Sequence, residues 1–175
     1  MLSKYGLYEL SIRYVGNRGA SRHLISNTIC ARCGLNATMI SNSIQDTVEY
    51  AKQLASEAHP GDIICLDGDL GVGKTVFAQG FASGLGITDP ITSPTFTIMN
   101  IYNSGRLPLY HYDVYRIEDE SEMDELGYEE YFFGNGVTLV EWASQIPDCI
   151  PTNAKHIEIK KDPTKGDNYR EITCS

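Results

Sequence analysis

Residues 68–75 are Gly68-Asp69-Leu70-Gly71-Val72-Gly73-Lys74-Thr75. This stretch matches the phosphate-binding loop pattern G-x-x-x-x-G-K-[ST] at every required position. The apolar run Ile63-Ile64-Cys65-Leu66 precedes it, and apolar residues at helical spacing follow it from Phe77 to Leu85. A strand before the loop and a helix after it form the context in which this pattern binds phosphate. The sequence therefore predicts a nucleotide-binding site built around this loop.

The residue types of the loop explain this expectation. Glycines at 68, 71 and 73 let the backbone curl so that its N–H groups point at anionic oxygens. Lys74 brings a positive charge to the outer phosphates, and the hydroxyl of Thr75 is placed to hold Mg²⁺. The helix that Thr75 opens adds the positive end of its dipole.

Helices and strands are expected to alternate along most of the chain. A helix should begin at Ser43, where Asp46 completes a weak capping box, and end before His59-Pro60-Gly61-Asp62. Two β-rich stretches, 96–102 and 107–115, flank the turn residues 103–106 and predict a hairpin.

The rest of the chain completes the pattern. We expect one short helix within the acidic stretch 118–133, a buried strand over 137–140, and late strands over 156–160 and 169–173. This order predicts an α/β fold, a three-layer sandwich like that of P-loop NTPases, and the hairpin makes its β-sheet mixed. The expected core residues are Ile63, Ile64, Leu66, Phe77, Phe81, Leu85, Leu139 and Val140.

The chain has 175 residues and a formal net charge of −9, which argues against a protein that grips nucleic acid across its whole surface. Charge is unevenly spread, because residues 1–38 carry five basic residues and one acid, whereas the remainder carries nine basic residues and 22 acids. We expect residues 39–175 to form one P-loop ATPase domain and residues 1–38 to be an N-terminal extension. That extension could be poorly ordered, could be upstream sequence translated from a misplaced start before Met39, or could be an organelle-targeting peptide.

The five cysteines form no disulfide framework. Cys30 and Cys33 make a lone C-x-x-C motif, and a structural zinc site would need a second pair at fitting spacing. Scattered thiols without a framework are typical of a reduced, cytoplasmic protein. The apolar runs are too short for a membrane span, so no membrane association is expected.

Two acids are candidate Mg²⁺ ligands, because a phosphate loop needs carboxylate support near Thr75. Glu141 follows the apolar run 137–140 and precedes Trp142, whereas Asp113 ends the β-rich run 109–112. Either acid could instead leave the sheet edge for solvent. The segment around Thr95 lies between the second helix and the hairpin, where its hydroxyls could meet Mg²⁺, phosphate or an attacking water, although such a run is often only a turn.

A series of motifs in this order resembles the TsaE (YjeE) family of bacterial ATPases, which act in tRNA threonylcarbamoyladenosine biosynthesis. The resemblance covers roughly residues 40–173 and rests on the phosphate loop followed by Ser93-Pro94-Thr95-Phe96-Thr97, His111-Tyr112-Asp113-Val114-Tyr115-Arg116, Leu126-Gly127-Tyr128-Glu129-Glu130-Tyr131-Phe132 and Val140-Glu141-Trp142. The loop alone is unspecific, whereas the ordered set is specific.

The resemblance implies a Mg²⁺-dependent ATPase that is slow alone and works with the TsaB–TsaD complex, which transfers threonylcarbamoyl to an adenosine beside the anticodon. Contact with tRNA would be indirect. The implied catalytic residues are Lys74, Asp113, Glu141 and Thr95. The implied ATP or ADP ligands are Leu70, Gly71, Val72, Gly73, Lys74, Thr75 and Trp142, with weaker matches at Thr47 and Gly166. The implied Mg²⁺ ligands are Thr75 and Glu141.

Other nucleotide-binding classes fit less well. A guanine-nucleotide switch should carry an N-K-x-D motif, which this sequence lacks. A small P-loop kinase would be expected to show an Arg-rich lid, but the later half has only Arg106, Arg116 and Arg170. A nucleotide-binding assembly factor whose hydrolysis is incidental remains an alternative.

Overall fold

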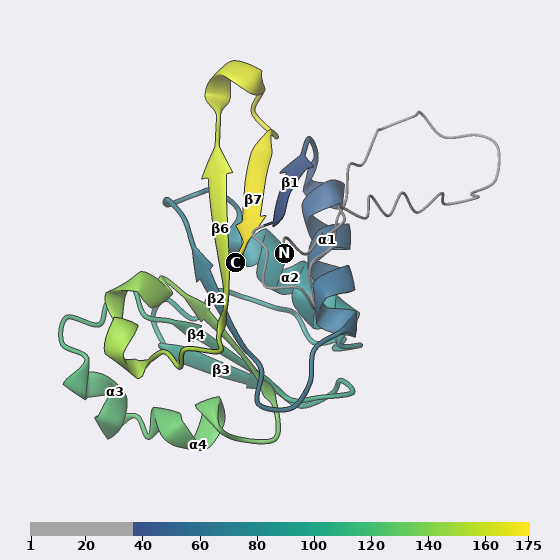
Figure 1. The fold of residues 1–175 in the computed structure, drawn as a ribbon. Helices are drawn as coiled ribbons and strands as arrows, with labels where there is room; N and C mark the ends of the chain where they lie inside the picture. The colour runs from purple at the N-terminus through teal and green to yellow at the C-terminus, as the bar shows by residue number, and fades with distance from the viewer. Residues whose placement is uncertain (1–36) are drawn as a thin grey trace, which may run out of the picture.

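The predicted phosphate loop connects a central strand to a helix. In the computed structural model, which describes residues 37–175, β2 (Ile63–Asp67) leads into the loop and α2 (Lys74–Gly84) leaves it. Around them lies a seven-stranded sheet in the order β1-β7-β6-β2-β5-β4-β3 (Figure 1). The other strands are β1 (Ala37–Ser41), β3 (Met99–Tyr102), β4 (Leu109–Asp113), β5 (Val137–Glu141), β6 (Lys155–Lys161) and β7 (Arg170–Cys174).

The sheet is mixed, as the sequence predicts. Strands β6, β2, β5 and β4 pair in parallel, so their carboxyl ends meet at one edge. Strands β3 and β4 pair antiparallel across the turn 103–106, which confirms the predicted hairpin. Strand β7 pairs antiparallel with both β6 and β1.

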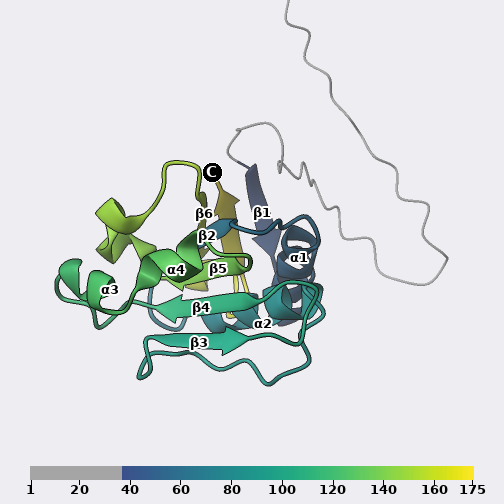
Figure 2. The same ribbon diagram turned by 90° about the horizontal axis from the view of Figure 1, so that it is seen from below.

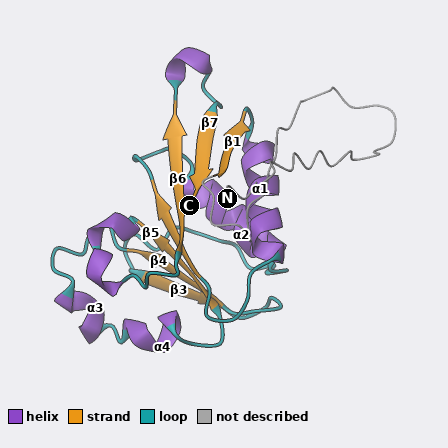
Figure 3. Cartoon of the chain, viewed as in Figure 1, coloured by secondary structure: helices purple, strands orange, loops and turns teal. Residues whose placement is uncertain are grey.

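Alternate residues of the central strands belong to two separate hydrophobic cores, one on each face of the sheet. Ile64 and Leu66 join the cluster beneath α1 (Ile44–Ser56) and α2, whereas Ile63 and Cys65 join the cluster beneath α3 (Ser121–Glu125) and α4 (Tyr128–Phe132). The two helical layers lie on opposite sides of the sheet (Figure 2), and Figure 3 separates helices from strands by colour. All eight expected core residues are buried.

Helices α1 and α2 approach each other closely because α2 presents glycine to α1. A Cβ on Gly80 would lie 2.7 Å from the Val48 carbonyl oxygen, and a Cβ on Gly84 would lie 2.5 Å from the Lys52 oxygen. Helix α1 begins as predicted, with the Ser43 hydroxyl accepting the Asp46 amide at 3.1 Å.

Two local expectations were wrong. Residues 118–133 contain two short helices, α3 and α4, because Gly127 adopts a left-handed conformation (φ 64°) that separates them. The strand expected from residue 96 begins only at Met99, because the amides of Thr97 and Ile98 bond back to the Pro94 carbonyl in a turn. Phe96, in that turn, is 86% exposed.

The predicted boundary at Met39 falls inside β1, which begins at Ala37 and pairs with β7. Cys30 and Cys33, like the rest of residues 1–36, lie outside the described residues. Among the helices of residues 37–175, none combines the length and apolarity needed to cross a bilayer.

Candidate active site

The ends of three neighbouring parallel strands build the site. Strand β2 ends at Asp67 and passes directly into the phosphate loop, whereas β5 ends at Glu141 and β4 ends at Asp113. In the sheet register Glu141 lies opposite Leu66 on one side and Asp113 on the other. The fold therefore brings the loop and both predicted acids to one edge.

Lys74 is 6% exposed and is held by the loop itself. Its ammonium donates to the carbonyl oxygens of Gly68 at 2.7 Å and Asp69 at 3.2 Å, and lies 3.7 Å from the centre of the Trp142 ring. Burial lowers the pKa of Lys74, and nearby carboxylates, Glu141 foremost, partly oppose that shift. An anionic phosphate would offer this ammonium a stronger partner than backbone carbonyls do.

Glu141 and Asp113 are each only 2% exposed. They do not leave the sheet edge for solvent, so that alternative was wrong. Carboxylates directly opposite each other on neighbouring strands repel, and burial strengthens the repulsion. The arrangement thus suits a cation, and Lys74 supplies only one positive charge.

Mg²⁺ fits this set of side chains. It prefers oxygen ligands and usually takes one or two protein carboxylates, with phosphate oxygens and waters completing its shell. Glu141 supplies a buried carboxylate, and Thr75 is the second residue of α2, next to the loop. Within residues 37–175 there is no cluster of three or more His, Cys, Asp or Glu side chains arranged around a metal position.

Asp113 ties the Thr95 segment to the site. Its Oδ2 accepts the hydroxyls of Thr95 at 2.5 Å and Ser93 at 2.9 Å, and its Oδ1 accepts the Tyr115 amide at 3.1 Å. The predicted segment therefore contacts a strand-end carboxylate directly.

Trp142 lies beneath Lys74. It adopts a left-handed backbone (φ 65°), with its amide donating to the Leu66 carbonyl at 3.0 Å. Its ring packs against Tyr115, with ring centres 5.1 Å apart. The Asp67 carboxylate accepts the amide and hydroxyl of Ser144, which anchors the segment following Trp142.

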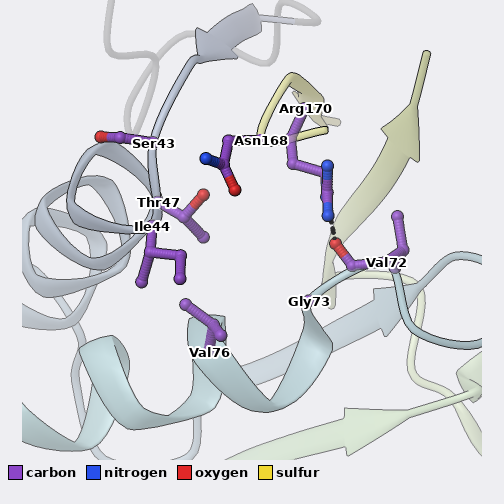
Figure 4. Close-up of a pocket in the computed structure, with 8 residues that line it drawn as sticks. All are labelled: Ser43, Ile44, Thr47, Val72, Gly73, Val76, Asn168 and Arg170. Atoms are coloured by element: carbon purple, nitrogen blue, oxygen red, sulfur yellow. Dashed lines mark hydrogen bonds between the residues drawn. The ribbon is translucent and has the colours of Figure 1, made fainter. Parts of the chain in front are cut away.

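A small pocket, partly open to solvent, adjoins the last loop residues. Its lining comes from α1, the loop, α2 and the β6–β7 connection (Figure 4): Ser43, Ile44, Thr47, Val72, Gly73, Val76, Asn168 and Arg170. Thr47, expected near the nucleotide base, lines this pocket and shares a 2.8 Å hydrogen bond with Ser41. Ile44, at the start of α1, is 63% exposed and lines the same pocket.

The remaining predicted nucleotide ligands lie in the phosphate loop and in the connection between β6 and β7. Leu70 is 78% exposed, whereas Val72 is buried. Gly166 is exposed just after the short helix η3 (Pro163–Lys165) and is not among the pocket-lining residues. Asn168 of the same connection and Arg170, the first residue of β7, do line it.

Sequence reasoning missed His111, Asn168 and Arg170. Arg170 donates from Nε to the Val72 carbonyl at 2.5 Å, and so joins the start of β7 to the loop. No local motif marks this contact, because it joins residues 98 positions apart. His111, inside a predicted strand, contacts Glu141 at 2.9 Å.

Comparisons with known proteins agree with this architecture. The family model described as threonylcarbamoyl adenosine biosynthesis protein TsaE matches residues 41–172. The tRNA threonylcarbamoyladenosine biosynthesis protein TsaE of Bacillus subtilis (strain 168) is 56% identical over 129 residues, which are 74% of this chain and 78% of that protein. The protein of the same name from Treponema pallidum (strain Nichols) is 38% identical over 136 residues, 78% of this chain and 98% of that one. A crystal structure of B. subtilis YdiB superposes with a TM-score of 0.69 at 46% identity, covering 80% of this chain and 84% of that chain.

Proposed function

We propose, because this chain belongs to the TsaE family, that it binds ATP with Mg²⁺ and hydrolyses it in support of tRNA threonylcarbamoyladenosine biosynthesis. The observation that carries the proposal is the meeting of the phosphate loop, Glu141 and Asp113 at adjacent strand ends. Its partner would be the TsaB–TsaD complex in the cytoplasm, with tRNA contacted only indirectly.

Each residue has a role that follows from its place. The loop amides and the Lys74 ammonium would bind the phosphates, with Lys74 leaving the Gly68 and Asp69 carbonyls to do so. Thr75 and Glu141 would hold Mg²⁺, which neutralises charge that develops on the phosphate oxygens.

Asp113 would act on the water that attacks the terminal phosphate. Its carboxylate already holds the Thr95 hydroxyl, and an acid in this position can orient a water or accept its proton. The nucleoside would lie at the pocket beside Thr47, which adjoins the loop at Val72 and Gly73.

The test is steady-state hydrolysis of ATP and GTP, with and without TsaB–TsaD. We expect slow ATP turnover that rises with the partners, falls by at least about 100-fold in Lys74→Ala and Glu141→Ala, and is unchanged in Glu125→Ala, whose carboxylate lies exposed on α3. A preference for GTP, or turnover indifferent to both site substitutions, would refute the proposal. ATP binding without partner-dependent turnover would favour the assembly-factor alternative.

A further inference from the structure

His111 is a buried polar side chain that the proposed mechanism does not yet use. It lies on β4 between Asn100 of β3 and Leu139 of β5, and none of it is exposed. Its Nε2 lies 2.9 Å from Oε1 of Glu141, and its Nδ1 is buried with no hydrogen-bond partner in the described part of the chain, residues 37–175.

These contacts assign the hydrogen of the ring. A buried N–H without an acceptor costs more free energy than a lone pair without a donor. Because Nδ1 has no partner, the hydrogen belongs on Nε2, where Oε1 of Glu141 accepts it. One oxygen of Glu141 is then occupied by His111.

Packing alone does not explain a histidine at this position. His111 shares a sheet face with Leu109 and pairs in register with Leu139, and both leucines belong to the apolar core. A leucine would fill such a place without burying an unpaired ring nitrogen. Among residues 37–175, the only polar contact of the ring is the one with Glu141.

We propose that His111 is a positioning residue for the metal site. Its Nε2–H holds Oε1 and fixes the carboxylate, so that Oε2 of Glu141 would remain available to hold Mg²⁺. The inference rests on the proposed function, since it requires Glu141 to be a metal ligand. Partners of this kind orient metal-binding carboxylates, and losing one typically weakens metal affinity about 10- to 100-fold.

Three variants separate positioning from packing. His111→Leu keeps the approximate volume and removes the donor. In His111→Gln the side-chain amide can still reach Glu141, whereas the shorter amide of His111→Asn cannot, so this pair keeps the test valid should the leucine variant fail to fold. Affinity is measured for Mn²⁺ in the presence of ATP by electron paramagnetic resonance, and ATP affinity is measured separately in EDTA.

We expect Mn²⁺ affinity to fall about 10- to 100-fold in His111→Leu and His111→Asn and to be largely restored in His111→Gln. ATP affinity in EDTA should stay at the wild-type level in all three. Wild-type Mn²⁺ affinity in the leucine and asparagine variants, or an equal loss of ATP affinity in EDTA, would overturn the inference.

Glu141→Ala distinguishes this failure from failure of the proposed function. If Mn²⁺ binding is lost in Glu141→Ala but kept in the His111 variants, only the role of His111 is refuted. If Glu141→Ala binds Mn²⁺ as the wild type does, both proposals are refuted.

Discussion

Glu141 and Asp113 place two buried carboxylates directly opposite each other, which a protein selected only for stability would avoid. The positive charge of Lys74 neutralises one of these two negative charges. The remaining negative charge makes the site receptive to a cation, and without one the two carboxylates are expected to repel each other.

The expected repulsion predicts that Glu141→Gln does not destabilise the metal-free protein. Glutamine keeps an oxygen for the His111 donor and removes one of the opposed charges, so we expect the free energy of unfolding in EDTA to match the wild type or exceed it by about 0.2–1 kcal/mol. Urea denaturation measures the difference, with Glu125→Gln on the surface of α3 as the control. A loss of more than about 1 kcal/mol would mean that the charge of Glu141 supports the fold.

The site residues that can be predicted from sequence are those marked by a short local pattern. The loop spacing predicts the roles of Lys74 and Thr75, and acids that follow apolar strands predict Glu141 and Asp113. His111 could not be predicted as a site residue in the same way. Its contact with Glu141 depends on the register between β4 and β5, which no local sequence pattern indicates.

Helices α1 and α2 set one wall of the pocket, since Thr47 comes from the first and Val76 from the second (Figure 4). Their separation is fixed where Gly80 meets Val48, with no room for a side chain. The width of the pocket is therefore a property of the helix pair.

Gly80→Ala should accordingly destabilise the protein, although alanine favours helix by about 1 kcal/mol over glycine. The added methyl group would force the helices apart, and we expect a net loss of about 1–3 kcal/mol with weaker ATP binding. Ser83→Ala, on the exposed side of the same helix, is the control. Thermal denaturation and ATP titration of both variants check this, and an equally stable Gly80→Ala protein would contradict it.

Most helices and strands follow from periodicity, while their ends do not. The helix expected within 118–133 is broken by Gly127, and the strand expected at residue 96 is delayed by a turn closed on Pro94. Both changes arise from backbone conformations that the apolar pattern of the neighbouring residues does not encode.

In the whole molecule, segments that are far apart in the sequence meet around the phosphate loop. Strand β7 pairs with β1 at the sheet edge, and Arg170 at the start of β7 bonds to Val72 in the loop. The strand order, with β7 between β1 and β6, could not be read from sequence, because pairing across such distances leaves no local signal.

A chain shortened to begin at Met39 should still fold and bind ATP. It would lose Ala37 and Thr38, the first residues of β1, which pair with Cys174 and Thr173, but keep the pairing of Met39 with Ile172. We expect a small fall in melting temperature relative to a chain that begins at Ala37, with equal ATP affinity in both. Failure of the shorter chain to fold would show that the first residues of β1 are essential.

The central claim is that the strand ends and the phosphate loop form one Mg²⁺–ATP site, and calorimetric titration with ATP in Mg²⁺ and in EDTA tests it most directly. The wild type should bind ATP more tightly with Mg²⁺. Glu141→Ala should bind ATP in EDTA as the wild type does and gain little from Mg²⁺. Equal wild-type affinity in Mg²⁺ and EDTA, or a full Mg²⁺ effect in Glu141→Ala, would contradict the account.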